Sequence, residues 1–306
     1  MAAEPSIESA PKQPTVAAID ASCRLPLFVM FASAAVWLVI GSVFALISTL
    51  TFHRPSLFAN SAWLSYGRAY PAFFNSLLYG FCVQAGLAVA LWIIARIGRV
   101  RLMHRWLPTI GAKLWNLGVT VGVIAILAGD STGFPHAEIP GYAALIMFLG
   151  YLLIGIWIVL TFHQRCERPL FVAQWFLLAA LFWFPWIYST AYLLLVTFPV
   201  RGVAQAVITW WFSNNLIVVW LGLIGLGAIF YFLPKLTSGE LYSRYLSLFA
   251  FWGLLLFASW GAIPDSAPVP AWMPSLTTVA TVFIALPVVS VALNIFGTLR
   301  DQGEKV

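Results

Sequence analysis

Charge is the scarcest property of this sequence of 306 residues. Only 8% of the residues are Asp, Glu, Lys or Arg, while 62% are hydrophobic, against about 25% charged residues in an ordinary soluble domain. Because so much apolar surface cannot be buried in one soluble core, we expect a polytopic membrane protein. The composition therefore argues against soluble enzymes, nucleic-acid-binding proteins and disulfide-stabilised domains.

Motifs that bind metals or haem are also missing. The three cysteines are far apart, and without a CxxCH motif the chain cannot attach a c-type haem covalently in that way. The four histidines form no HH, HxH or HxxxH pattern, and all fall in predicted loops. A haem b needs axial ligands that face each other, so a haem held by His53 with His136, or by His104 with His163, is the less favoured interpretation.

Long apolar runs dominate the rest of the chain. A spanning helix takes roughly 20 residues, and we predict an all-α integral membrane bundle of about eight transmembrane helices, forming one domain over residues 26–299. Residues 1–25, rich in Ala, Pro and Ser, are predicted to be a disordered cytoplasmic tail, and residues 300–306 a second tail. The predicted spans are Leu27–Leu50, Pro71–Ala95, Leu114–Ala128 with an extension over Trp106–Ile110, Tyr142–Phe162, Leu170–Val196, Trp210–Leu233, Leu246–Ile263 and Met273–Phe296.

Basic residues are distributed very unevenly among the predicted loops. If the N-terminus is cytoplasmic, 13 of the 16 lysines and arginines face the cytoplasm, and only Arg54, Arg68 and Arg201 face outward. This is the positive-inside pattern of multi-pass proteins, and an even number of spans places both termini in the cytoplasm. Because this topology explains the net charge of +6, we expect a lipid bilayer and no nucleic acid as a partner.

No acidic residue falls within a predicted span. Proton pumps and carriers of charged substrates usually keep ionisable groups inside the membrane, at a cost of about 3 kcal/mol each. The sequence therefore argues against such transport by this chain alone. All ten acidic residues are assigned to tails or loops: Glu4, Glu8, Asp20, Asp130, Glu138, Glu167, Glu240, Asp265, Asp301 and Glu304.

A collinear series of short motifs carries a family resemblance. In chain order the segments are WLSYGR at 63–68, AQWF at 173–176, WWFSNN at 210–215, YFLPK at 231–235, LYSRYLS at 241–247, FW at 251–252 and PAW at 270–272. Together they resemble the catalytic subunit, subunit I, of the cbb3-type (C-family) haem-copper cytochrome c oxidases. The resemblance runs from about Leu27 to Asn294 and implies a bundle of the subunit I type.

The resemblance fails at the metal ligands. Phe73 stands where the family has a histidine of its low-spin haem, Asn214 where it has a copper ligand, and Pro264 and Asp265 where it has a His-His pair. Phe and Pro cannot coordinate a metal, and a lone amide is a poor ligand. The resemblance therefore implies a truncated relative with no catalytic, cofactor or metal site of its own. We expect aromatic side chains to fill the space that haem takes in the family: Phe73, Phe74, Trp210, Trp211 and Phe212.

The leading functional hypothesis rests on this resemblance. It is a non-catalytic subunit of a respiratory or electron-transfer complex in the bacterial inner membrane, so the chain alone is not expected to be an enzyme. It would scaffold or dock c-type cytochromes, which carry haem c, or other redox subunits. Arg54, Arg68 and Arg201 are candidate docking contacts, although headgroup contact explains any single one as well. The outer segments that would carry docking are 51–70, 129–141, 198–209 and 264–272.

Two alternatives stay open. The chain could belong to a quinol- or haem-using oxidoreductase with a cryptic site shared with partners, because a quinone pocket needs only apolar walls and a few polar groups. It could also be a neutral-solute transporter lined by amides, although such amides more often join helices, with about 0.6–2 kcal/mol per hydrogen bond. The amides in or near the predicted spans are Asn75, Gln84, Asn116, Asn214, Asn215 and Asn294.

Overall fold

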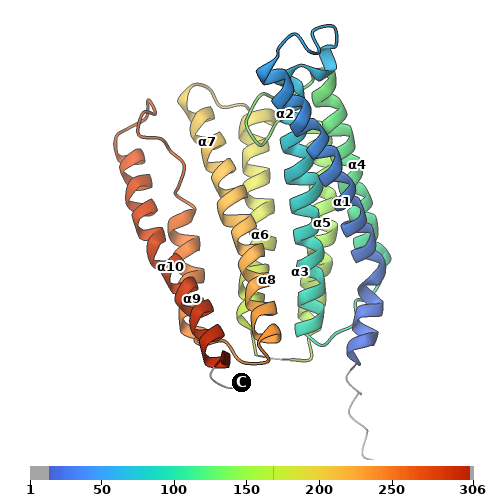
Figure 1. Cartoon of the computed structure of the whole chain (residues 1–306), viewed down its shortest axis with the longest axis vertical. Helices are drawn as coiled ribbons and strands as arrows, with labels where there is room; N and C mark the ends of the chain where they lie inside the picture. Colours follow the sequence, from blue (N-terminus) through green and yellow to red (C-terminus); the bar gives the residue numbers. More distant parts are fainter. Residues whose placement is uncertain (1–13, 168, 304–306) are drawn as a thin grey trace, which may run out of the picture.

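A computed structural model describes residues 14–167 and 169–303, and all of its regular structure there is helical. The helices stand side by side in one bundle (Figure 1). In chain order the elements are α1 (Val16–His53), η1 (Ala62–Leu64), α2 (Tyr66–Asn75), η2 (Ser76–Val83), α3 (Gln84–Ile97), α4 (Trp106–Ala128), α5 (Gly141–His163), α6 (Val172–Tyr192), η3 (Leu193–Thr197), α7 (Val203–Asn214), η4 (Asn215–Trp220), α8 (Leu221–Leu236), α9 (Arg244–Gly253), η5 (Leu254–Ala258) and α10 (Trp272–Gly303).

Seven helical stretches in the described part of the chain are long and apolar enough to cross a membrane. The chain is therefore a multi-pass membrane protein. Three of the seven are continuous rods that contain a π-helical segment: it joins two α-helices in α2–η2–α3 and α7–η4–α8, and it extends α6 at its end in α6–η3. All eight predicted spans are found as helices, with ends that shift by several residues.

The seventh helical rod in chain order, α9–η5, is shorter than predicted. We expected a span over Leu246–Ile263, but the rod formed by α9 (ten residues) and η5 (five residues) ends at Ala258. The segment that follows contains Pro264, Pro268 and Pro270, which cannot donate the backbone hydrogen bonds that a continuing helix requires.

Both ends of the described chain lie at the same end of the bundle (Figure 1). We call this end, which carries Val16 and Gly303, the termini end, and the opposite end, which carries His53 and Trp272, the far end. An even number of passes produces this arrangement, as the eight predicted spans require. That the termini end faces the cytoplasm stays a prediction.

Helices extend beyond the predicted domain limits at both ends. Helix α1 begins at Val16, where the Thr15 side chain accepts a hydrogen bond from the Ala18 backbone and so caps the helix. Residues 16–25 are therefore helix and not tail, and Asp20 lies within α1. At the other end α10 continues to Gly303, beyond the predicted limit of residue 299. Residues 1–13 and 304–306 lie outside the described residues.

The six amides singled out above join neighbouring elements. Asn116 of α4 accepts a hydrogen bond from Trp37 of α1 (2.9 Å) and donates one to Gln84 of α3 (2.5 Å). Gln84 in turn donates to the Met30 carbonyl of α1 (3.0 Å), and Asn294 of α10 donates to the Ser243 carbonyl beside α9 (2.8 Å). The amides proposed to line a transport path are thus used in interhelical hydrogen bonds, as such groups commonly are.

Candidate functional site

Phe73 lies in the wall of a surface groove and not in the centre of the bundle. The groove has a volume of about 290 Å³ and runs between α1 and α2. Within α2 the Phe73 ring contacts Tyr70 and Phe74, with centroid separations of 6.0 and 6.1 Å. The other residues that line the groove are Ala45, Ser48, Thr49, Phe52, Tyr66 and Tyr70.

Hydrogen bonds from Asn214 and Asn215 connect the end of α7 to the end of η5. Asn214 donates its amide to the Ala258 carbonyl (2.6 Å), and Asn215 donates to the Ser259 carbonyl (3.0 Å). Trp183 of α6 donates its indole N–H to the side-chain carbonyl of the fully buried Asn215 (3.1 Å). Because the last carbonyls of a helix have no partner within the helix, these amides complete the hydrogen bonding of η5.

Pro264 and Asp265 belong neither to the lining of the groove beside Phe73 nor to the hydrogen bonds of Asn214 and Asn215. They belong to the exposed segment between η5 and α10. The Asp265 carboxylate accepts a hydrogen bond of 3.4 Å from the Thr278 hydroxyl of α10. The four positions at which the resembled family has ligands therefore have three separate local environments.

The centre of the bundle is filled with aromatic side chains. Tyr151 of α5 stacks on Phe184 of α6 with a centroid separation of 4.2 Å, and Trp220 of η4 meets Phe184 edge-on at 5.6 Å. Phe212 is the only one of the five predicted space-filling aromatics that is buried; Phe73, Phe74, Trp210 and Trp211 are partly exposed. The largest fully buried aromatics are Trp115, Trp220, Tyr79, Tyr151, Tyr188, Phe176, Phe184 and Phe212.

A polar cluster at the far end connects the part of α2 that carries Phe73 with the part of α7 that carries Asn214. The far-end loop (residues 129–140) connects α4 to α5 and contains His136 and Glu138. The Nδ1 atom of His136 lies 2.6 Å from the Ser213 hydroxyl, beside Asn214, and its ring meets Phe74, beside Phe73, at 4.5 Å. The far-end loop thus occupies the space between α2 and α7.

Glu138 is the buried acid of this loop. Its side chain is only 8% exposed and accepts a hydrogen bond of 3.0 Å from the Asn75 amide of α2. Burial raises the pKa of the Glu138 carboxyl above its ordinary value, and the hydrogen bond from Asn75 partly opposes that rise. Burial also lowers the pKa of His136, against the opposite effect of a hydrogen bond to the Pro135 backbone. Both groups are therefore biased towards their neutral forms.

A comparison with protein families decides the relationship. The sequence profile described as cytochrome c and quinol oxidase polypeptide I matches residues 26–305.

The chain belongs to this oxidase subunit I family.

Individual relatives agree with the family assignment at low identity. The chain is 26% identical over 265 residues to a cytochrome c oxidase subunit 1 homolog of Azorhizobium caulinodans, covering 78% of this chain and 48% of the relative. It is 25% identical over 299 residues to cytochrome c oxidase subunit 1 of Rhodobacter capsulatus (88% and 53%). It is 23% identical over 291 residues to the cbb3-type cytochrome c oxidase subunit CcoN1 of Stutzerimonas stutzeri (89% and 59%). The chain spans about half the length of the curated relatives it matches.

The residues at the resembled ligand positions do not fit haem or copper. Phe73 and Pro264 have no side-chain donor atom, a lone amide such as that of Asn214 is a poor ligand, and Asp265 is exposed on a loop. Among the described residues, no three His, Cys, Asp or Glu side chains lie close enough together to hold a metal ion. The absence of a cofactor from the chain as a whole stays a prediction.

The three candidate docking arginines differ in their surroundings. Arg68 donates a hydrogen bond of 3.0 Å to the Leu127 carbonyl and lies against Gly129, so it stabilises the end of α4. Arg54 and Arg201 are exposed. These two arginines therefore remain available for contact with a partner or with lipid.

Sequence reasoning missed the burial of Glu138 and the hydrogen bonding of Asp20. Glu138 was treated as an ordinary loop residue, although the short loop between two spans, with Pro135 and Pro140 near its end, was a signal of close packing. Asp20 was assigned to a tail, but its carboxylate accepts a hydrogen bond from Trp92 and pairs with Arg96. The apolar residues Ile19 and Cys23, four apart on one face of α1, were the available signal for the early start of that helix.

Proposed function

We propose that this chain is a non-catalytic subunit of a respiratory or electron-transfer complex in the bacterial inner membrane. The observation that carries the proposal is the combination of a retained subunit I bundle with ligand positions whose side chains pack or bond within the protein. A bundle that keeps its surface without its metal donors can still bind neighbouring subunits. It would hold c-type cytochromes or other redox subunits, whose haem c carries the electrons.

Docking would take place at the far end of the bundle. Arg54 and Arg201 are exposed cations there, and each can pair with an acidic side chain or a propionate of a partner. Such rim charges mainly steer association and make it sensitive to salt. Loss of both charges is therefore expected to weaken the complex several-fold without unfolding the chain.

The test is co-purification followed by a reduced-minus-oxidised visible spectrum. We expect a gentle preparation of the tagged full chain to carry a c-type cytochrome, and a stringent preparation to be free of haem bands. The double variant Arg54→Gln/Arg201→Gln should retain several-fold less cytochrome, whereas Lys113→Gln in α4 should match the wild type. A stoichiometric b-type band after the stringent preparation contradicts the proposal, and so does a gentle preparation that contains no redox partner.

A quinol-using subunit is the second candidate, and one observation favours it. The groove between α1 and α2 is lined by aromatic rings, and its tyrosines, Tyr66 and Tyr70, are partly exposed. Apolar walls with a few hydroxyl groups are sufficient to hold a quinone ring. Quinol oxidation by the gentle preparation that is lost in Tyr70→Phe, but unchanged in Tyr245→Phe, would favour this function over the first.

A further inference from the structure

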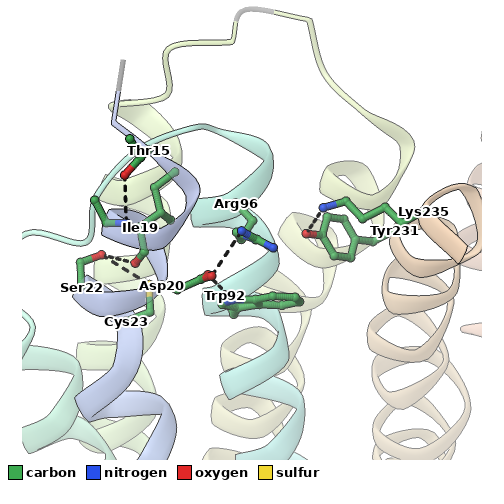
Figure 2. A network of polar contacts seen from close by, with 10 residues as sticks. Thr15, Ile19, Asp20, Ser22, Cys23, Trp92, Arg96, Tyr231 and Lys235 are labelled. Carbon is green, nitrogen blue, oxygen red and sulfur yellow. Dashed lines mark hydrogen bonds and ion pairs between the residues drawn. The ribbon is translucent and has the colours of Figure 1, made fainter. Parts of the chain in front are cut away.

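Trp92 connects three helices at the termini end of the bundle. Its indole N–H donates a hydrogen bond of 3.0 Å to the Asp20 carboxylate of α1. Its ring meets Tyr231 of α8 edge-on at 5.6 Å and stacks on Phe232 at 5.9 Å. Figure 2 shows Trp92 between Asp20 on one side and Tyr231 on the other. The ends of α1, α3 and α8 are therefore fixed to one another at this point.

Two cations lie over these adjoining rings. The Arg96 guanidinium is 5.2 Å from the centre of the Trp92 ring, and the Lys235 ammonium is 4.3 Å from the centre of the Tyr231 ring. Figure 2 shows Lys235 bonded to the Tyr231 hydroxyl and Arg96 bonded to Asp20 above the Trp92 ring. Because the two rings are in contact, the two positive charges share one small area of the surface.

The charges in this area do not balance. Asp20 uses one carboxylate oxygen for Trp92 and the other for Arg96, at 3.3 Å. Lys235 donates a hydrogen bond of 2.6 Å to the Tyr231 hydroxyl, which is neutral. The Nε atom of Arg96 is buried and has no hydrogen-bond partner among the described residues. Two cations face one carboxylate, so a further anion would be attracted here.

The surroundings indicate what kind of molecule carries this anion. Arg96 and Lys235 lie in the last turns of α3 and α8, where two membrane-spanning rods end. Below them Phe232 is 40% exposed and Leu236 beside them is 81% exposed. Cations above apolar and aromatic side chains match a lipid, whose phosphate lies at the interface and whose acyl chains lie along the helix.

We propose that Arg96 and Lys235 bind the phosphate of an anionic phospholipid at the junction of α3 and α8. The guanidinium and the ammonium both donate charge-assisted hydrogen bonds to phosphate oxygens. The lipid's acyl chains lie against Phe232 and Leu236. The site selects a headgroup of net negative charge over a zwitterionic one, because a headgroup ammonium would be repelled by the two cations.

The test measures lipid binding to the purified, delipidated full chain by native mass spectrometry. The probes are phosphatidylglycerol and phosphatidylcholine with identical acyl chains. We expect phosphatidylglycerol to bind more tightly, and Lys235→Gln to lower its affinity about five-fold, the value of about 1 kcal/mol for one interfacial cation. Lys235→Arg should keep most of the affinity. Lys113→Gln, the same change at an exposed position of α4, is the matched control.

Several results would overturn the proposal. If phosphatidylglycerol and phosphatidylcholine bind equally well, the headgroup charge does not determine which lipid binds. If Lys235→Gln and Lys113→Gln have equal affinities for phosphatidylglycerol, the site lies elsewhere. Displacement of phosphatidylglycerol by inorganic phosphate at millimolar concentration means that the site binds a soluble anion. A loss of binding in Lys235→Gln with an unchanged unfolding temperature supports the site, because the substitution then acts on binding and not on the fold.

Discussion

At the scale of single residues, Asn214 and Asn215 have structural roles. Asn214 is shorter than the histidine it replaces in the resembled pattern, yet its amide reaches the Ala258 carbonyl at the end of η5. Asn215 makes the equivalent bond to Ser259 one residue further on. Two neighbouring amides thus donate to two neighbouring carbonyls at the end of η5, where the helix supplies no further N–H groups.

The buried acid of the far-end loop makes stability depend on pH. Because the pKa of Glu138 is raised in the folded chain, the folded state binds this proton more tightly than the unfolded state. The Glu138 contribution to stability therefore falls as pH rises from about 4.3, the ordinary carboxyl pKa, through the raised value. We expect Glu138→Gln, which stays neutral, to unfold at a higher temperature than wild type at pH 8, with the difference shrinking towards pH 4.

The control for this prediction is Glu240→Gln, which removes an exposed carboxyl. It should leave the pH dependence of the unfolding temperature unchanged. The lowered pKa of His136 acts with the opposite sign, because its neutral form is favoured in the folded chain and stability is lost as the pH falls below about 6.5. The comparison of wild type with Glu138→Gln cancels this histidine contribution. An identical pH profile of the two would show that Glu138 is solvated.

At the scale of elements, α4 and α5 are held together by close backbone approach. A Cβ atom on Gly150 would lie 2.7 Å from the Trp115 backbone nitrogen and 2.8 Å from the Gly111 carbonyl oxygen. Neither contact can be relieved by a side-chain rotation, since both involve backbone atoms. Small residues at such crossings allow the van der Waals contact that joins helices in membranes.

Gly150→Ala is therefore expected to destabilise the chain by about 1–3 kcal/mol, the usual cost of overpacking. The matched control is Gly225→Ala in α8, where an added Cβ meets no atom within 4 Å. That change should be neutral or stabilise by up to about 1 kcal/mol, because alanine favours the helix. Thermal unfolding in one detergent measures both. If the two variants unfold at the same temperature, the close approach of α4 and α5 is not a source of stability.

The elements themselves could be predicted from the sequence more easily than their details. The length of an apolar run is a local property, so all eight helices were predictable. The start of α1 was not, because residues 16–25 are helical partly through Asp20, whose partners Trp92 and Arg96 lie more than 70 residues away. The π-helical segments were not predictable either, because these rods are apolar on nearly every face and a local change of hydrogen-bond register leaves no residue-type signal there.

The candidate site, too, could be predicted from the sequence only in part. The sequence is sufficient to predict that Phe73 and Pro264 offer no donor, because this follows from residue type alone. The burial of Glu138 depends on Asn75, 63 positions earlier in the chain, and no local pattern contains that information. The same holds for the aromatic centre, where Phe212 was expected but Tyr151, Phe184 and Trp220 were not.

At the scale of the whole molecule, the topology depends on the shortest rod. The 15 residues of α9 and η5 span about 22 Å at 1.5 Å per residue, which is less than the roughly 30 Å of the hydrocarbon core. The turn at Ser259 and Trp260 and a locally thinner bilayer can make up this difference. The rod is antiparallel to α10 and bonded to it through Asn294 and Ser290, so we expect it to cross the membrane.

A topology reporter tests this expectation directly. Fusions at the two termini should report the same side, and that side should be the cytoplasm because most basic residues lie at the termini end. A fusion inserted after Gly202, in the far-end segment between η3 and α7, should report the opposite side and serves as the control. If α9 and η5 enter and leave on one side, the C-terminal fusion will instead agree with the Gly202 fusion. That result would place α10 in the opposite direction across the bilayer and rule out the packing of its Asn294 against Ser243.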